Sequence, residues 1–170
     1  MKVLTEAALL ARIRAWTLIL MVGLFISGFS AIPLQPEMNF LVKAFAQNSP
    51  STVVGAWILH VQSAVNDVSA RWPFLALGTD WLAFGHIVIG IGFIGLLRDP
   101  VRNEWLITWG MIACLLVLPW AWCFGWARGI PWGWRLVDCS FGAGGMVPLL
   151  LIRIYVQELK RGQLSSLPNP

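Results

Sequence analysis

Four long apolar runs constrain this chain more than any other feature of its sequence. The runs cover residues 15–32, 80–97, 105–124 and 136–156. Each is close to the ~20 mostly apolar residues that an α-helix needs to cross a bilayer. In lipid, only helices and closed barrels satisfy their own backbone polar groups. The sequence therefore predicts an all-α integral membrane protein, a four-transmembrane-helix bundle in a single domain, residues 1–170.

The first run follows Arg12 and Arg14, which is the charge pattern of a signal peptide. The run is nevertheless about long enough to span a bilayer, whereas a signal peptide has a shorter apolar region. We therefore expect it to remain in the protein as the first spanning helix.

Charged residues make up only 12% of the chain, against roughly 25% in soluble domains. The net charge is +4, but the Lys and Arg residues are scattered at the ends of the apolar runs. Nucleic-acid-binding proteins instead cluster these residues on one solvated face. We therefore expect the lipid bilayer, and no nucleic acid, as a partner.

The basic residues at the run ends predict the orientation in the membrane. With four spans, both termini lie on one side, together with Lys2, Arg12, Arg14, Arg98, Arg102, Arg153, Lys160 and Arg161. The other side holds Lys43, Arg71, Arg128 and Arg135. Because cytoplasmic loops carry the excess of Lys and Arg, we expect cytoplasmic termini, in a bacterial inner (cytoplasmic) membrane.

The link between the second and third spans reads RDPVRNE and is short. Asp99 before Pro100 suits a helix N-cap followed by proline at the first helical position. The sequence therefore predicts a tight helical hairpin here.

The segment 34–79 is too weakly apolar to span the membrane. It carries two apolar stripes at helical spacing, the first of Met38, Leu41, Val42 and Phe45 and the second of Val54, Trp57, Ile58, Val61, Val65 and Val68. We expect two short amphipathic helices on the outer, non-cytoplasmic side.

His86 lies inside the second span, where an ionisable side chain is expected to face the bundle interior and to pair. Asp138 lies near the outer start of the fourth span, on one face with Gly142 and Gly145. Glycine faces allow helices to approach closely. We therefore expect a polar cluster of His86 and Asp138, extended by Arg135 and Cys139. Such a cluster either fixes the helix register or forms a binding or proton-handling site.

The chain has two histidines, His60 and His86. Two imidazoles on separate elements can serve as the axial ligands of one haem b. This alternative makes the protein an electron carrier or a quinone-site subunit, whereas the simpler alternative leaves His60 at the surface.

Tryptophan gathers in the stretch WAWCFGWARGIPWGWR. Indole rings favour the headgroup zone of a bilayer. The residues that we expect to contact headgroups, or to line a pocket for a quinone, pigment or lipid, are Trp122, Trp126, Trp132, Trp134 and Arg128. An anionic headgroup suits the charge of Arg128 and Arg135.

The sequence lacks HExxH, GxSxG and a glycine-rich phosphate loop, and no cysteine has metal-ligand spacing, so we predict no metal site and name no catalytic residue. Cys123 and Cys139 are the candidates for a disulfide. The function that we expect is that of a non-enzymatic subunit, or a component that binds a small ligand, lipid or cofactor. Its partners would be other membrane subunits or further copies of itself. The alternatives are the haem or quinone subunit and a membrane enzyme that uses the His86, Asp138 and Cys139 cluster.

Overall fold

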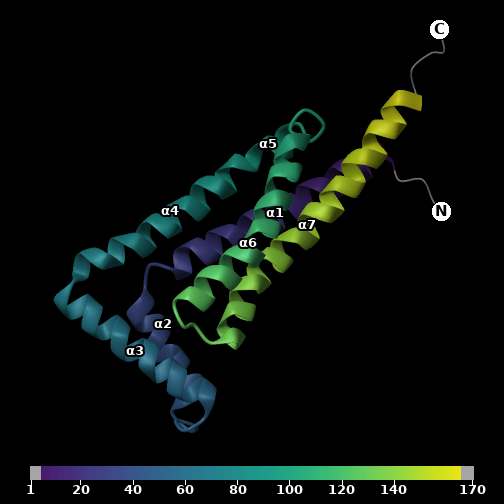
Figure 1. Cartoon of the computed structure of the whole chain (residues 1–170). Helices are drawn as coiled ribbons and strands as arrows, with labels where there is room; N and C mark the ends of the chain where they lie inside the picture. The colour runs from purple at the N-terminus through teal and green to yellow at the C-terminus, as the bar shows by residue number, and fades with distance from the viewer. Residues whose placement is uncertain (1–4, 166–170) are drawn as a thin grey trace. The chain divides into compact units, whose positions relative to one another are not determined.

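The computed structural model describes residues 5–165, so Lys2 lies outside the described residues. The structure is 87% helical, and its described part contains no strand. The elements in chain order are α1 (Glu6–Ser30), α2 (Leu34–Leu41), the π-helix η1 (Val42–Ala46), α3 (Val53–Arg71), the 3₁₀-helix η2 (Pro73–Ala76), α4 (Leu77–Gly92), α5 (Ile94–Arg98), α6 (Glu104–Ala127) and α7 (Trp132–Ser165) (Figure 1).

Four helical stretches are long and apolar enough to cross a membrane, which confirms the predicted number of spanning helices. They are Glu6–Ser30, Pro73–Arg98, Glu104–Ala127 and Trp132–Gln163. The predicted run 15–32 extends beyond the first helix, because the chain turns after Ser30 with hydrogen bonds from Ala31 N to Gly28 O and from Ile32 N to Phe29 O.

The chain forms two compact units. Unit 1 contains residues 1–23 and 90–170, and unit 2 contains residues 24–89.

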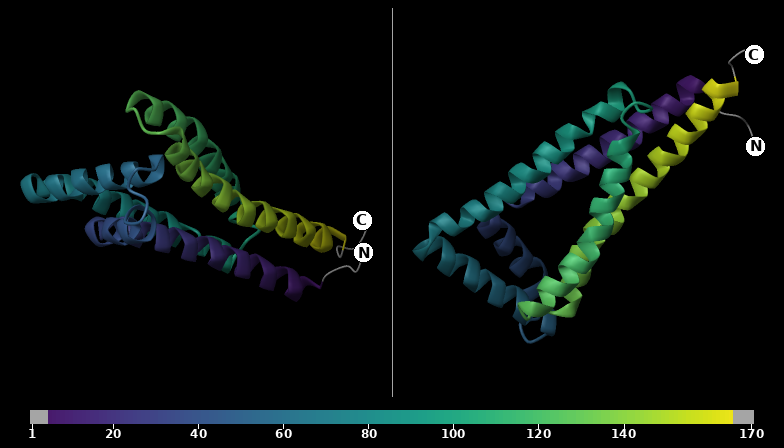
Figure 2. Two further views of the ribbon diagram at one scale, coloured as in Figure 1. Left: turned by 90° about the horizontal axis from the view of Figure 1, so that it is seen from below. Right: turned by 45° about the horizontal axis from the view of Figure 1, so that its top comes forward.

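The core of unit 1 lies where α1 begins, α5 meets α6 and α7 ends. Its fully buried side chains recur at helical spacing on four helices, as Ile13, Thr17, Leu96, Ile107, Leu149, Ile152 and Val156. The Thr17 hydroxyl donates to Ile13 O at 2.8 Å, which satisfies the one polar side chain in this set. In unit 1, α6 and α7 run side by side and antiparallel (Figure 2).

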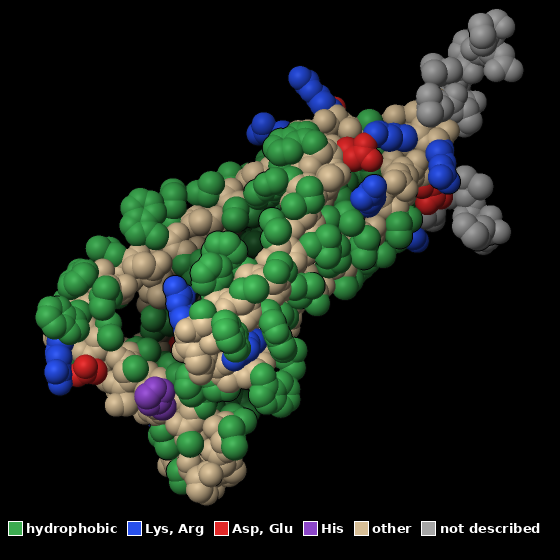
Figure 3. Space-filling model, in the orientation of Figure 1, with side chains coloured by type: hydrophobic (Ala, Val, Ile, Leu, Met, Phe, Trp, Pro, Cys, Tyr) green, Lys and Arg blue, Asp and Glu red, His purple; other side chains and the backbone are tan. Residues whose placement is uncertain are grey.

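Charged side chains surround this core and form what we call the basic end: Glu6, Arg12, Arg98, Arg102, Glu104 and Lys160. Lys160 forms an ion pair with Glu104 and so joins the end of α7 to the start of α6. The Arg12 guanidinium lies 5.5 Å from the ring centre of Tyr155, which joins α1 to α7. Figure 3 shows Lys, Arg, Asp and Glu side chains gathered over the α5–α6 turn and the end of α7. Unit 1 therefore brings together several of the basic residues at the ends of the predicted apolar runs.

The α5–α6 turn differs from its prediction in one respect. Asp99 Oδ1 accepts a hydrogen bond from Arg102 N at 2.9 Å, but helix α6 starts only at Glu104, with Asn103 as its N-cap. The N-cap prediction for Asp99 is thus wrong by four residues, because residues 100–103 form turns before the helix. Asn103 Nδ2 donates to Gly95 O at 3.1 Å and to Asp99 O at 2.9 Å, and so closes the turn.

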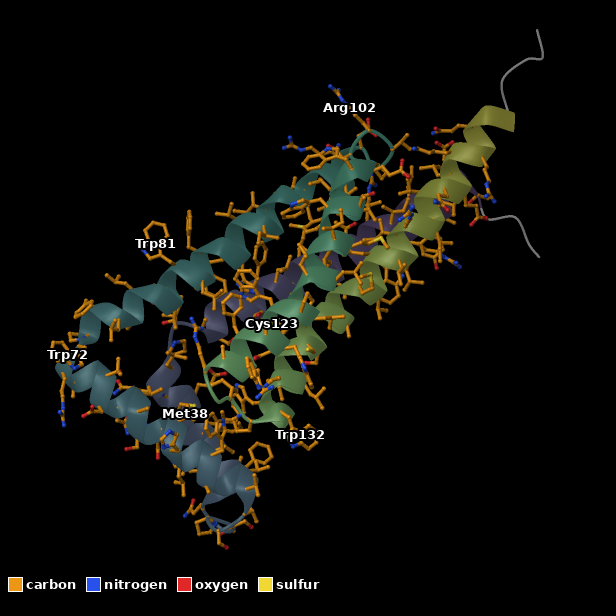
Figure 4. All side chains as sticks on the ribbon, in the orientation of Figure 1. Met38, Trp72, Trp81, Arg102, Cys123 and Trp132 are labelled. Carbon is orange, nitrogen blue, oxygen red and sulfur yellow. The ribbon has the colours of Figure 1, made fainter. Side chains whose placement is uncertain are left out.

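In unit 2, helices form in both segments that carry the predicted apolar stripes, and α2 and α3 pack against each other as a helical hairpin. Met38, Ala46 and Ile58 form its core, and Val61 and Val65 pack at its edge; Figure 4 labels Met38 on α2. Two pairs of side-chain amides link the polar edge, Gln35 with Asn66 at 3.4 Å and Asn39 with Gln62 at 2.7 Å. The two stripes therefore cover each other.

Phe45 and Val54 belong to the predicted apolar stripes, but they lie outside the shared core of α2 and α3, with 59% and 61% of their surfaces exposed. For Phe45, the reason is the π-helical turn of η1, where Gln47 N donates to Val42 O at 2.8 Å. This i→i+5 spacing widens the turn, so that Ala46 and not Phe45 enters the core.

Candidate functional site

The turn between α6 and α7 ends helix α6 with a glycine-dependent motif. Gly129 has φ +68°, Ile130 N donates to Gly125 O at 2.8 Å, and Gly129 N donates to Trp126 O at 3.1 Å. These two bonds form a Schellman motif, which favours glycine because an L side chain is strained at this φ. Pro131 follows and prevents the helix from continuing.

This turn fixes the position of Arg135 on the first turn of α7. Arg135 Nε donates to Ile130 O at 2.8 Å, and its guanidinium lies 5.6 Å from the ring centre of Trp122 on α6. Gly125 makes room, because a Cβ there would lie 2.8 Å from Arg135 Cγ and 2.9 Å from its Cδ. The two terminal nitrogens of Arg135 make no hydrogen bond within the part of the chain that the structure describes. Their N–H groups are therefore available to an acceptor.

A second arginine and a group of indole rings surround this position. The Arg128 guanidinium lies 5.8 Å from the ring centre of Phe124. Trp126 and Trp132 are 74% and 69% exposed, and Trp132 lies at the start of α7 (Figure 4). We call the set Trp122, Phe124, Trp126, Arg128, Trp132 and Arg135 the arginine–tryptophan turn. It combines two cations on aromatic faces with exposed indole N–H donors.

Asp138 and Cys139 lie one turn further along α7, and both are half-buried. The Arg135 side chain does not pair with Asp138, because its Nε is bonded to Ile130 O and its guanidinium stacks on Trp122. The Asp138 carboxylate makes no hydrogen bond or ion pair among the described residues of its unit. Within unit 1, the predicted extension of the polar cluster to Arg135 is therefore not formed.

The glycine face of α7 packs against α6. A Cβ at Gly142 would lie 2.6 Å from Cys114 O, and one at Gly145 would lie 2.9 Å from Cys114 Sγ. The glycine face of α7 thus contacts α6 within unit 1, a contact that the sequence analysis did not predict. The physical reason is that the tight turn at Gly129 brings α7 back along α6, and small residues let the two backbones approach.

His86 lies on α4 in unit 2 and is half-buried. Its Nδ1 is 2.9 Å from Leu82 O, and because a carbonyl oxygen can only accept, Nδ1–H is the donor in this contact. Gly28 of α1 lies against it, because a Cβ at Gly28 would be 3.0 Å from His86 Cβ and 3.0 Å from Ala83 O. The pairing of His86 with Asp138 stays a prediction.

His60 is exposed on α3, with its ring centre 5.5 Å from that of Trp57. The indole Nε1 of Trp57 is buried and has no hydrogen-bond partner among the described residues. No described contact joins His60 to His86, so the haem pair also stays a prediction. Cys114, Cys123 and Cys139 are free thiols, and the described residues contain no group of three potential metal ligands.

Sequence reasoning missed Gly125, which makes room for Arg135, and Gly28, which packs against His86. The Gly129-Ile130-Pro131 order was a readable signal for the end of helix α6, because glycine followed by proline marks a helix C-terminus. No sequence signal distinguishes Gly125 from a glycine facing lipid, because close approach of two helices is a property of the packed pair.

Comparisons with protein-family models, with curated proteins and with solved structures found no match to this chain.

Proposed function

We propose that this protein is a non-enzymatic, lipid-binding component of a membrane assembly, and that the arginine–tryptophan turn holds an anionic phosphate headgroup. The observation that carries this proposal is the fixed position of Arg135. Its guanidinium is held by Trp122 and by Ile130 O, while its terminal N–H groups stay available. A donor that is ordered before binding loses little conformational entropy when a ligand arrives.

The chemistry of the turn fits a phosphate oxygen. A planar guanidinium offers two parallel N–H groups to phosphate, and such charge-assisted bonds are about twice as strong as neutral ones. Arg128 adds a second cation, and the exposed rings of Trp126 and Trp132 suit the headgroup zone. The turn joins two membrane-spanning helices, Glu104–Ala127 and Trp132–Gln163, which supports its position near a headgroup layer.

Lipid retention tests the proposal. The protein, purified in mild detergent, should retain phosphatidylglycerol or cardiolipin, measured by mass spectrometry of the co-purified lipid. Arg135→Gln should weaken binding of a short-chain phosphatidylglycerol by roughly tenfold or more, because a hydrogen bond to a charged group is lost. Arg102→Gln removes the same charge at the exposed α5–α6 turn and should leave binding unchanged. Equal retention by both variants would refute the proposal.

The tryptophans separate headgroup binding from simple anchoring. If Trp126 and Trp132 only anchor the protein at the interface, Trp→Phe should have small, equal effects, since most of the apolar ring remains. If they contact a bound headgroup, each change should lower lipid retention while the melting temperature stays the same.

Membership in an assembly is supported by the low burial of the spans, whose most apolar windows are only 22–28% buried. Apolar faces of this kind are available to partner helices as well as to lipid acyl chains. Size-exclusion chromatography and proteomics in mild detergent should show a stoichiometric membrane partner or a homo-oligomer. A monomer that purifies alone would refute this part of the proposal.

A second candidate function, a haem b electron carrier, is favoured by one observation on His86. Its Nδ1 lies 2.9 Å from Leu82 O, and a histidine whose Nδ1–H donates to a carbonyl presents Nε2 to a metal. When bound, the haem would supply one-electron transfer, and His86 would be a residue that holds its iron. A Soret band in the purified protein that disappears in His86→Ala would establish this function, and a colourless preparation would refute it.

A further inference from the structure

The basic end of unit 1 contains a cleft of about 360 Å³ that the arginine–tryptophan turn does not involve. Three segments line it: the start of α1, the α5–α6 turn and the end of α7. Pockets for small molecules span about 300–1,000 Å³, so this cleft suits a small ligand or one part of a larger one. We propose that it binds the phosphoethanolamine headgroup of a zwitterionic lipid.

The charges of the lining define the ligand. Among the described residues, the lining contains the cation Arg98 and the two carboxylates Glu6 and Asp99. Arg98 makes no hydrogen bond or ion pair within residues 5–163, so its guanidinium is available to a phosphate. A purely anionic ligand would meet two carboxylates, whereas a ligand with one phosphate and one ammonium group matches both signs.

The carboxylates are arranged to accept from an ammonium group. Glu6 Oε1 accepts from Gln163 Nε2 at 3.4 Å, which joins the first turn of α1 to the last turn of α7. Asp99 Oδ1 is bonded to Arg102 N at 2.9 Å, and its second oxygen makes no bond among the described residues. A primary ammonium group has three donors and can bond to these carboxylates.

The apolar part of the lining favours a lipid over a soluble molecule. Leu10 and Leu159 form walls beside the charged rim. Glu6 and Arg98 are the first and last residues of membrane-spanning stretches, which places the rim at the boundary between headgroups and acyl chains. None of the lining residues in the described part of the chain is aromatic, whereas quaternary ammonium groups such as choline are bound by aromatic cages. The cleft therefore selects a primary ammonium group.

The test measures the melting temperature of the full chain in detergent against increasing concentrations of short-chain lipids. Phosphatidylethanolamine should give a saturable rise. Phosphatidylcholine of the same chain length should bind at least about tenfold more weakly, because it lacks the N–H donors of a primary ammonium group. Equal affinity for phosphatidylcholine, or no saturable rise with phosphatidylethanolamine, would overturn the proposal.

Variants locate the binding. Arg98→Gln and Glu6→Gln should each weaken phosphatidylethanolamine binding by about tenfold or more, and both positions are exposed, so the fold should survive. Arg102→Gln is the matched control, because Arg102 lies on the same turn but points away from it (Figure 4) and does not line the cleft. Unchanged affinity in Arg98→Gln would overturn the proposal.

Two further measurements test whether the bound headgroup belongs to a lipid or to a soluble molecule, and whether the two proposed lipid sites are independent. Free phosphoethanolamine should compete only weakly, and competition as strong as that of the lipid would show a soluble ligand and overturn the lipid proposal. Arg135→Gln should leave phosphatidylethanolamine binding unchanged, since Arg135 does not line this cleft. Failure of the anionic-lipid proposal would thus be seen separately from failure of this one.

Discussion

At the residue scale, the arrangement of the arginine–tryptophan turn depends on two glycines with different roles. Gly129 supplies a positive φ that ends helix α6, and Gly125 supplies space for the Arg135 side chain. The first role is conformational and the second is steric, so the two sites respond differently to substitution.

Gly125→Ala should weaken anionic lipid binding without unfolding the protein. The new Cβ would lie 2.8 Å from Arg135 Cγ, so the arginine must leave its position on Trp122. The measurement is retention of phosphatidylglycerol, with the melting temperature as the check on folding. Gly133→Ala is the control, since nothing lies within 4 Å of a Cβ there. Full retention in Gly125→Ala would show that Arg135 does not bind the headgroup.

At the element scale, two helical hairpins are closed by side-chain amides. Asn103 closes the α5–α6 turn with two bonds to carbonyl oxygens, and Gln35–Asn66 and Asn39–Gln62 link α2 with α3. Gly95 O and Asp99 O also accept from the backbone N–H groups of Asp99 and Asn103, so the Asn103 amide adds a second donor to each carbonyl at the end of α5.

Asn103→Ala should destabilise unit 1 by about 1 kcal/mol, because Gly95 O and Asp99 O each lose a side-chain donor and keep only a backbone N–H donor. Thermal unfolding in detergent measures the loss, and amide hydrogen exchange should rise within residues 95–103. Arg102→Ala is the control, since only the backbone N–H of Arg102 enters the turn. A melting temperature as high as that of the parent chain would contradict this role of Asn103.

At the scale of the whole molecule, the four spanning helices leave two questions to experiment: the orientation in the membrane and the partner of His86. Unit 1 places the start of α1, the α5–α6 turn and the end of α7 around one cleft. These are three of the segments whose basic residues we assigned to the cytoplasm.

A reporter fused after Pro170 should be cytoplasmic, and a reporter inserted near Asn48 should be on the other side of the membrane. The reason is the excess of eight basic residues over four between the two sides. Alkaline phosphatase and green fluorescent protein fusions measure the two locations. The reverse pattern would overturn the orientation, and a shared side would overturn the number of spans between the two sites.

The predicted pairing of His86 with Asp138 has its own test. His86→Leu and Asp138→Leu should each lower thermal stability, because each leaves a polar partner in a low-dielectric setting. The double variant should be less harmful than the sum of the two, by on the order of 1 kcal/mol. Ser140→Leu is a control beside Asp138, since Ser140 is exposed and bonds only to Val137 O. Strictly additive losses would exclude the pair.

The sequence by itself determined the number of spanning helices and the two amphipathic stripes. Both follow from the surroundings of the chain. Unpaired backbone polar groups are too costly in lipid, and an apolar face at helical spacing packs against another apolar surface. Only the tertiary structure decided which faces meet. The stripes of α2 and α3 cover each other around Met38 and Ile58, and the glycine face of α7 packs on Cys114 of α6.

The same distinction holds for the candidate site. Composition indicated the cations and tryptophans of the α6–α7 turn, because Arg and Trp are characteristic of a membrane interface. The environment of Arg135 arises from a left-handed glycine, a missing Cβ and a ring on another helix. Sequence periodicity does not predict that these groups lie close to Arg135, so the packing of the helices alone determines this environment.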